Sequence, residues 1–131
     1  MSASYSILLL EDEPLILMDI EMAGHDRGCD IFTATTCDEA LNVLDRNAGI
    51  NIAILDVTLA DGCTCVPVAR ELAERGIPFL LHSGDLDRQN ETVRELAVPL
   101  IAKPAAAEKV IAAAITMYEG KDRNDIQIAA E

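Results

Sequence analysis

The sequence contains no tryptophan and only two tyrosines and two phenylalanines among its 131 residues. Few aromatic rings are therefore available to hold a flavin, and no Gly-x-Gly-x-x-Gly motif follows the first apolar run to bind a dinucleotide. Basic residues are also scarce, because 10 lysines and arginines stand against 23 aspartates and glutamates, for a formal net charge of −13. This balance argues against nucleic acid as a direct ligand, since phosphate contacts require a basic surface.

Long hydrophobic runs are missing as well. No apolar stretch approaches the roughly 20 residues that span a bilayer, and the first four residues lack the basic start of a secretory signal. We therefore expect a cytoplasmic protein with no membrane partner. In the cytoplasm Cys29, Cys37, Cys63 and Cys65 are expected to be reduced thiols, because a Cys-x-Cys pair without a second pair is not a structural zinc pattern.

What the chain does contain is an alternation of short apolar runs with amphipathic patterns. Its residues are 50% hydrophobic, which is enough for the core of one domain. Strands are predicted over 5–10, 30–34, 51–55, 77–82 and 99–102. Helices are predicted over 14–26, from 36–38 to 48, and over 64–75, 87–96 and 106–119. This order predicts an α/β fold, a doubly wound (βα)5 domain with a five-stranded parallel sheet over 1–120, followed by a polar tail over 121–131 that we expect to be loose.

Individual residues predict where some helices begin and end. Thr36 or Asp38 is the expected cap of the second helix, and Pro67 is compatible only with the first turn of the third. Gly120 is expected to end the fifth helix. The fourth helix, over 87–96, has the thinnest apolar face and is the one expected to shift or fray.

The strongest local signal is the aliphatic run over 7–10, which leads directly into Glu11, Asp12, Glu13 and Pro14. An unalternating apolar run is typical of a strand buried on both faces, and Pro14 suits the first position of a helix. The three carboxylates are therefore expected at the carboxyl end of a strand, where open parallel sheets bind their ligands. Because adjacent carboxylates repel one another, this turn predicts a cation site.

Three other predicted strands end in residues that suit the same chemistry. Asp56 follows the third strand, Ser83 the fourth and Lys103 the fifth, so all are expected at one edge of the sheet with the acidic turn. An aspartate can act as a nucleophile and form an aspartyl phosphate, and Mg²⁺, a lysine and a hydroxyl can stabilise phosphoryl oxygens. Each residue alone has an ordinary explanation, as a turn residue, a helix cap or a solvated lysine. Their order along the chain is what indicates phosphoryl transfer.

Four motifs occur in a fixed order over about residues 5–119: Leu10-Glu11-Asp12-Glu13-Pro14, Ile54-Leu55-Asp56 with Gly62 after it, His82-Ser83-Gly84, and Ala102-Lys103-Pro104. In this set the chain resembles the bacterial response-regulator receiver domains of two-component signalling. The resemblance implies a flavodoxin/CheY-like sheet with strand order 2-1-3-4-5. We expect a stand-alone receiver, since no output module follows residue 119.

The resemblance also implies roles for the matched acidic residues. Asp56 matches the aspartate that accepts the phosphoryl group, and Glu11 and Asp12 match the acidic pair that holds Mg²⁺, Asp12 more directly. The backbone carbonyl of Thr58 matches a further metal ligand. Glu13 is then left as a charge at the start of the first helix, where the macrodipole favours it.

Two further matches concern the conformational switch. Ser83 matches the switch hydroxyl, and Lys103 matches the family's lysine, whose peptide bond to Pro104 is cis in the family. Leu100 departs from the pattern, because the best-known receivers carry tyrosine or phenylalanine three residues before the lysine. Ser83 and the fourth helix are therefore expected to carry the rearrangement without an aromatic switch.

The implied function is a phosphorylation switch and not an enzyme, because such a chain catalyses only its own phosphorylation and dephosphorylation. A sensor histidine kinase or a histidine phosphotransfer protein would dock on the first helix and donate phosphate to Asp56. A downstream target protein would then read the modified face. The surface formed by the fourth helix, fifth strand and fifth helix is a candidate homodimer or target face.

Two alternative functions use the same fold. One is a protein-interaction module that acts without phosphorylation, for which Leu100 leaves room. The other is an aspartyl-phosphate phosphatase, which would pair its nucleophile with a second aspartate two residues on. This chain has Thr58 at that position, which argues against the phosphatase.

Overall fold

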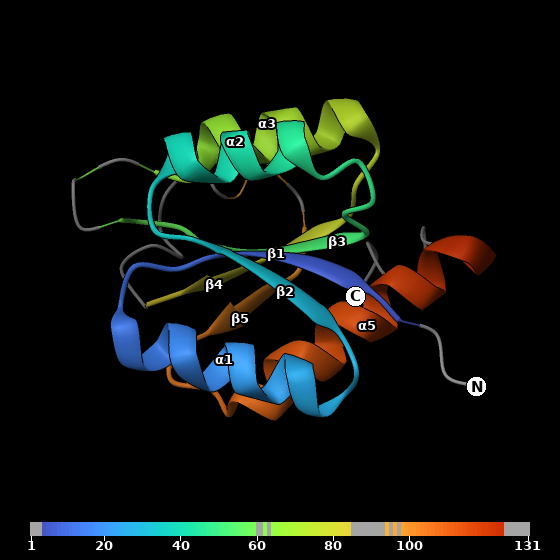
Figure 1. Ribbon diagram of the computed structural model, residues 1–131, viewed down its shortest axis with the longest axis horizontal. Helices are drawn as coiled ribbons and strands as arrows, with labels where there is room; N and C mark the ends of the chain where they lie inside the picture. Colours follow the sequence, from blue (N-terminus) through green and yellow to red (C-terminus); the bar gives the residue numbers. More distant parts are fainter. Residues whose placement is uncertain are drawn as a thin grey trace.

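A computed structural model describes residues 4–59, 62, 64–84, 94, 96 and 98–124, the last four of these for the backbone alone. Its centre is a sheet of five parallel strands (Figure 1). The strands are β1 Ser6–Leu10, β2 Asp30–Ala34, β3 Ile52–Asp56, β4 Phe79–Ser83 and β5 Leu100–Ala102. Their order across the sheet is β2-β1-β3-β4-β5, which confirms the predicted topology.

Four helices cover the sheet in the part of the chain that the structure describes: α1 Pro14–Asp26, α2 Cys37–Arg46, α3 Val66–Arg75 and α5 Ala107–Asn124. Helices α2 and α3 lie on one face of the sheet, and α1 and α5 lie on the other (Figure 1). None of these helices is long and apolar enough to cross a membrane. The helix predicted over 87–96 falls almost entirely outside the described residues.

Each face of the sheet packs against its own apolar cluster, which explains the unalternating apolar runs. Successive side chains of a strand point to opposite faces, so both sets must be hydrophobic when helices cover both faces. The cluster under α2 and α3 takes alternate strand residues, among them Leu8, Leu10, Ala53, Leu55 and Leu81. The cluster under α1 and α5 takes the others, among them Ile7, Leu9, Ile52, Ile54 and Leu80.

Helix α3 begins two residues later than the predicted start at residue 64. Thr64 forms an antiparallel bridge with Thr58, and the Cys65 N–H donates to the Val57 carbonyl at 2.9 Å. These backbone groups are occupied before the helix starts, so the first helical residue is Val66 with Pro67 in the first turn.

Two predicted helix ends were also wrong. Helix α2 ends at Arg46 and not at residue 48, because Asn47 leaves the helical conformation and its side-chain amide donates to the Val43 carbonyl at 2.8 Å. Helix α5 continues through Gly120 to Asn124, so Gly120 does not end it. A glycine inside a helix costs only about 1 kcal/mol, which does not by itself stop a helix.

The start of α2 has a side-chain cap, Thr36, which is one of the two residues that the sequence offered for this position. Thr36 precedes the helix in an extended conformation, and its hydroxyl oxygen accepts the Glu39 N–H at 3.1 Å. The Glu39 carboxylate in turn accepts the backbone N–H of Thr35 at 2.7 Å. The Glu39 N–H, which the helix start would leave without a partner, is thereby satisfied, and the Glu39 side chain also holds the residue before the cap.

We predict that Thr36→Ala lowers the free energy of unfolding by about 1 kcal/mol, because the Glu39 N–H loses its acceptor. Thr36→Ser keeps a hydroxyl and is expected to retain most of the stability. Urea unfolding followed by circular dichroism measures both. Equal losses in the two variants would show that the threonine methyl group, and not the cap, provides the stability.

Candidate functional site

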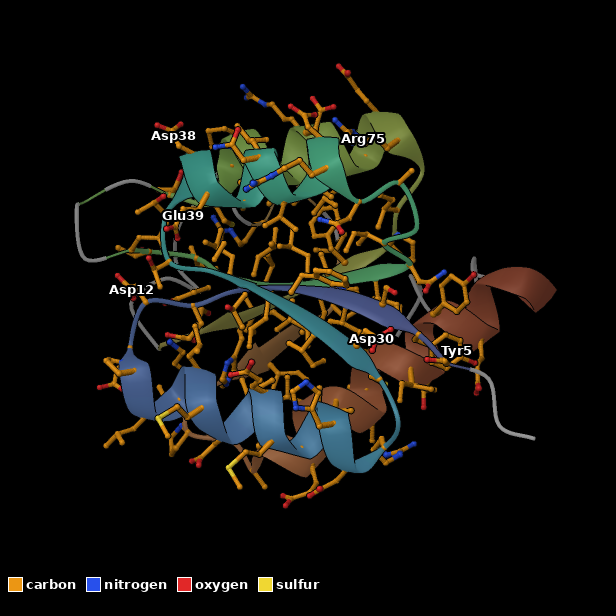
Figure 2. All side chains as sticks on the ribbon, in the orientation of Figure 1. Tyr5, Asp12, Asp30, Asp38, Glu39 and Arg75 are labelled. Carbon is orange, nitrogen blue, oxygen red and sulfur yellow. The ribbon has the colours of Figure 1, made fainter. Side chains whose placement is uncertain are left out.

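The parallel register brings the predicted site residues to one edge of the sheet. Leu10 pairs with Leu55, Asp56 with His82, and Ser83 with Ala102. The residues that follow β1, β3, β4 and β5 therefore lie together at the carboxyl edge. Figure 2 shows Asp12 at this edge, on the loop that leaves β1, on the same side of the molecule as the start of α2.

Strands β3 and β4 each extend one residue further than predicted, to Asp56 and Ser83. Both site residues are thus part of hydrogen-bonded strands and not of the loops that follow. A side chain on a paired strand is held more precisely than one on a loop. The sheet itself therefore positions the candidate nucleophile Asp56.

Lys103 lies between the two buried carboxylates of the edge. Its Nζ is 3.2 Å from Oε1 of Glu11 and 3.4 Å from Oδ2 of Asp56. Its backbone N–H donates to the Ser83 carbonyl at 2.7 Å, and its peptide bond to Pro104 is cis, as the resemblance implied. The lysine therefore connects the end of β5 to β4, and through its ammonium group to β1 and β3.

The acidic residues form a group that could hold a cation. Glu11 and Asp56 are 1% and 4% exposed, and each of these carboxylates offers an oxygen that lies within 4.8 Å of one from Asp12. Three carboxylates carry a formal charge of −3, and Lys103 supplies +1. The remaining −2 suits a divalent cation, and an all-oxygen set suits Mg²⁺.

The electrostatics of Asp56 reflect this surplus of negative charge. Burial and, next, the neighbouring Glu11 carboxylate together raise the pKa of Asp56 from its usual value to about 7, although Lys103 acts in the opposite direction and lowers it. Burial lowers the pKa of Lys103, but the Asp56 and Glu11 carboxylates outweigh this effect and raise it overall. Without a metal, the protonated and ionised forms of Asp56 are thus both populated near neutral pH, and a cation would favour the ionised form.

Glu13 has the helix-start position expected for it. Its carboxylate accepts the N–H groups of Leu15 and Ile16 at 2.9 and 3.1 Å, so it is the cap of α1. Its backbone N–H donates to the Glu11 carboxylate at 3.2 Å. The residues of the acidic turn therefore have different roles, because Glu13 caps the helix, while Glu11 and Asp12 face the candidate metal site.

Thr58 and Ser83 occupy the predicted neighbourhood in different ways. Thr58 is exposed two residues beyond Asp56, where its bridge to Thr64 fixes the backbone. Ser83 is fully buried, and its hydroxyl has no hydrogen-bond partner among the described residues. The role of the Thr58 carbonyl as a metal ligand remains a prediction.

Sequence reasoning quoted His82 in a motif but missed its place beside the site. His82 is 2% exposed, and its Nδ1 lies 3.9 Å from Oε1 of Glu11. Neither ring nitrogen has a hydrogen-bond partner within the described part of the chain. Burial and, to a lesser extent, the Lys103 charge lower the pKa of His82 to about 4, which favours the neutral imidazole at pH 7. The signal was a histidine at the end of an apolar run.

Leu100 takes the place of the aromatic residue that many receivers carry. It is partly buried and packs against the apolar cluster under α2 and α3, next to Leu81 on β4. An aliphatic side chain in this position contributes to packing and offers no ring or hydroxyl to change partners.

Comparison with known proteins identifies the family. No family model matches the chain. The structure of SdrG from Sphingomonas melonis Fr1 is 36% identical in sequence, with a TM-score of 0.75, over 91% of this chain and 99% of the SdrG chain. A response-regulator receiver domain from Clostridium thermocellum shares the fold, with 24% identity and a TM-score of 0.75 over 90% of this chain and 97% of that one. The chain belongs to the response-regulator receiver family.

A longer relative covers the same region. The phyllosphere-induced regulator PhyR of Methylorubrum extorquens is 28% identical over 124 residues, which are 91% of this chain and 46% of PhyR. The response regulator PhyR from Brucella abortus is 27% identical with a TM-score of 0.73, over 92% of this chain and 51% of that one. This receiver therefore spans about half the length of the PhyR proteins it matches.

The raised pKa of Asp56 predicts a pH-dependent stability without divalent cations. Because the folded-state pKa exceeds the usual value, Asp56 favours the folded state most below about pH 4, and this contribution is lost as the pH rises through 7. Asp56→Asn keeps a neutral side chain. We expect its stability gain over wild type to increase by about 3 kcal/mol between pH 4.5 and 7.5.

Urea unfolding in EDTA at several pH values measures this gain. Asp30→Asn, at an exposed position of β2, is the matched control for the loss of a carboxylate outside the site. A gain for Asp56→Asn that is constant across the pH range would contradict the raised pKa.

Lys103 is expected to be essential for the stability of the buried acidic pair. Lys103→Met leaves Glu11 and Asp56 without their nearby ammonium group and should lower the free energy of unfolding by about 2 kcal/mol at pH 7. Lys109→Met removes an exposed lysine of α5 and should change it by less than about 0.5 kcal/mol. Denaturant unfolding in EDTA compares the two variants. Similar losses of unfolding free energy would contradict a stabilising role of Lys103 in the acidic pair.

Proposed function

We propose that this receiver accepts a phosphoryl group on Asp56 from a phosphohistidine, in a reaction that depends on Mg²⁺. The donor would be a sensor histidine kinase or a histidine phosphotransfer protein. The observation that carries the proposal is the position of Asp56: a buried carboxylate at the end of β3, 3.4 Å from the Lys103 ammonium group and within a metal-capable acidic group.

The transfer itself requires little covalent chemistry from the protein. An oxygen of the Asp56 carboxylate attacks the phosphorus atom, the P–O bond forms, and the P–N bond to the donor imidazole breaks. Lys103 is placed to neutralise charge on the phosphoryl oxygens. Mg²⁺, when bound by Glu11, Asp12 and Asp56, supplies the remaining positive charge. Attack by water on phosphorus would later break the P–O bond to Asp56, release inorganic phosphate and return Asp56 to its carboxylate form.

The pKa of Asp56 explains why the reaction should depend on the metal. A protonated carboxyl group is a poor nucleophile, and burial together with Glu11 favours protonation. A bound cation reverses this preference because it stabilises the carboxylate. The same acidic group that destabilises the metal-free site thus makes the nucleophile respond to Mg²⁺.

The response to phosphorylation is expected to involve Ser83. Its hydroxyl is buried without a hydrogen-bond partner among the described residues, and its carbonyl already accepts from Lys103. A phosphoryl group on Asp56 would provide acceptor oxygens for this hydroxyl. Leu100 has no polar group to follow the change, so Ser83 and the segment after β4 would transmit it.

Helix α1 is the proposed docking surface for the phosphodonor. Leu15, Met18 and Met22 are 70%, 53% and 61% exposed, and their spacing of three and four residues places them on one stripe of the helix. This stripe begins one residue after the acidic turn. An exposed apolar stripe next to the nucleophile fits a partner that must bring its phosphohistidine to Asp56.

The other partner predictions depend on the same switch. A downstream target protein would distinguish the phosphorylated from the unmodified face. The homodimer surface proposed for the fourth helix, β5 and α5 lies partly outside the described residues and stays a prediction.

Labelling with acetyl phosphate and Mg²⁺ tests the proposal. We expect wild type to gain one phosphoryl group, by intact mass and by retardation in a phosphate-affinity gel, and EDTA to abolish the reaction. Asp56→Asn should not be labelled, because the amide is not a nucleophile. Asp30→Asn, the exposed control on β2, should be labelled like wild type.

Two outcomes would contradict the proposed site. Labelling of Asp56→Asn at another residue would move the acceptor elsewhere, and labelling that is unaffected by EDTA would remove the metal from the reaction. An assay with p-nitrophenyl phosphate separates the phosphatase alternative, because a phosphatase would release nitrophenol in many turnovers.

A further inference from the structure

Two cysteines belong to the side of the sheet covered by α2 and α3, where Cys65 lies in the apolar cluster and Cys37 packs against that cluster. Cys37 is the first residue of α2, and Cys65 immediately precedes the first residue of α3. The Cys37 thiol donates to the backbone carbonyl of Thr64 at 3.1 Å. This contact joins residues 27 positions apart in the chain, and Thr64 is bonded directly to Cys65.

The contact limits the distance between the two cysteines. In a trans peptide, a carbonyl oxygen lies about 2.8 Å from the Cα atom of the next residue. Sγ of Cys37 therefore lies within about 6 Å of the Cα atom of Cys65. A disulfide requires this sulfur to approach the same Cα atom to about 4 Å, so the sulfur would have to come closer by at most about 2 Å.

The two thiols differ in their exposure. Cys37 is partly buried, whereas Cys65 is 0% exposed and belongs to the apolar cluster under α2 and α3. A small oxidant therefore reaches Cys37 first. The buried Cys65 needs no access to solvent, since its reaction partner is a neighbouring side chain. Cys29 is buried in the cluster on the opposite face of the sheet and cannot substitute for either.

We propose that Cys37 and Cys65 form a redox modification site whose oxidant is a hydroperoxide. The Cys37 thiolate attacks the peroxide, the O–O bond breaks, and Cys37 becomes a sulfenic acid while the peroxide is reduced to water or an alcohol. The Cys65 sulfur then attacks the Cys37 sulfur, the disulfide forms, and water leaves. In sum, two thiols and one hydroperoxide yield one disulfide, one water and one further water or alcohol.

The disulfide would act on the backbone next to the phosphorylation site. The Cys65 N–H donates to the Val57 carbonyl at 2.9 Å, and Thr64 pairs with Thr58. Oxidation therefore attaches α2 to the segment that directly follows Asp56. This segment contains Thr58, whose backbone carbonyl is the predicted metal ligand. This consequence rests on the proposed function. The disulfide is expected to slow the phosphorylation of Asp56, because it limits how far this segment can move to accommodate a cation and a phosphoryl group.

The first experiment tests the modification site alone. Full-length protein is treated with hydrogen peroxide under denaturant-free conditions, alkylated, and analysed by intact mass and peptide mapping. We expect the oxidised protein to take up two alkyl groups fewer than the reduced protein, and a link between Cys37 and Cys65 that dithiothreitol reverses. Cys29→Ser should retain the link, whereas Cys37→Ser and Cys65→Ala should both lose it.

Cys63, which lies outside the described residues, provides the decisive comparison. Cys63→Ser should form the link as wild type does. A link that survives in Cys65→Ala but disappears in Cys63→Ser would overturn the pairing, as would the absence of any intramolecular disulfide in wild type. Circular dichroism of Cys65→Ala checks that it folds, and direct mapping of the wild-type disulfide gives the same answer without that variant.

The second experiment tests the consequence for phosphorylation. We expect acetyl-phosphate labelling of Asp56 to be at least threefold slower after oxidation, to recover with dithiothreitol, and to be insensitive to peroxide in Cys37→Ser. An unchanged rate in the fully cross-linked protein would refute the regulatory consequence. Failure of the reduced wild type to be labelled would instead count against the proposed function, and the disulfide mapping would be unaffected.

Discussion

The ammonium group of Lys103 holds together the edge on which the receiver's chemistry depends. It lies 3.2 Å from Glu11 and 3.4 Å from Asp56, and so connects β5 with the ends of β1 and β3. Both carboxylates are almost fully buried, where an ionised group without a nearby opposite charge is strongly unfavourable. The backbone N–H of Lys103 also donates to Ser83, so one residue organises the acidic pair and the end of β4.

This group of side chains has more negative than positive charge. Three carboxylates face one ammonium group, and the raised pKa of Asp56 expresses the deficit of positive charge. The two apolar clusters supply the stability that the edge does not, because β1 and β3 are buried on both faces. A rigid sheet thus supports a site that favours the binding of a cation and, by our proposal, of a phosphoryl group.

Much of the fold and of the site could be predicted because both follow from local patterns. The unalternating apolar runs predicted buried parallel strands, and the parallel order placed Glu11, Asp56, Ser83 and Lys103 at one edge. The exact ends of β3 and β4, the start of α3 and the end of α5 were predicted less accurately. They depend on bonds such as that from the Cys65 N–H to Val57 and on the small cost of a glycine inside a helix.

The sequence by itself determined the order of strands and helices, the acidic turn, the candidate phosphorylated residue and two candidates for the cap of α2, since these depend on residue type and spacing along the chain. Only the tertiary structure decided which distant groups meet. It placed His82 beside Glu11, packed Leu100 into the aliphatic core, and brought the Cys37 thiol to the Thr64 carbonyl. It also decided the pKa of Asp56, because burial and neighbouring charge are properties of the assembled edge and not of the residue.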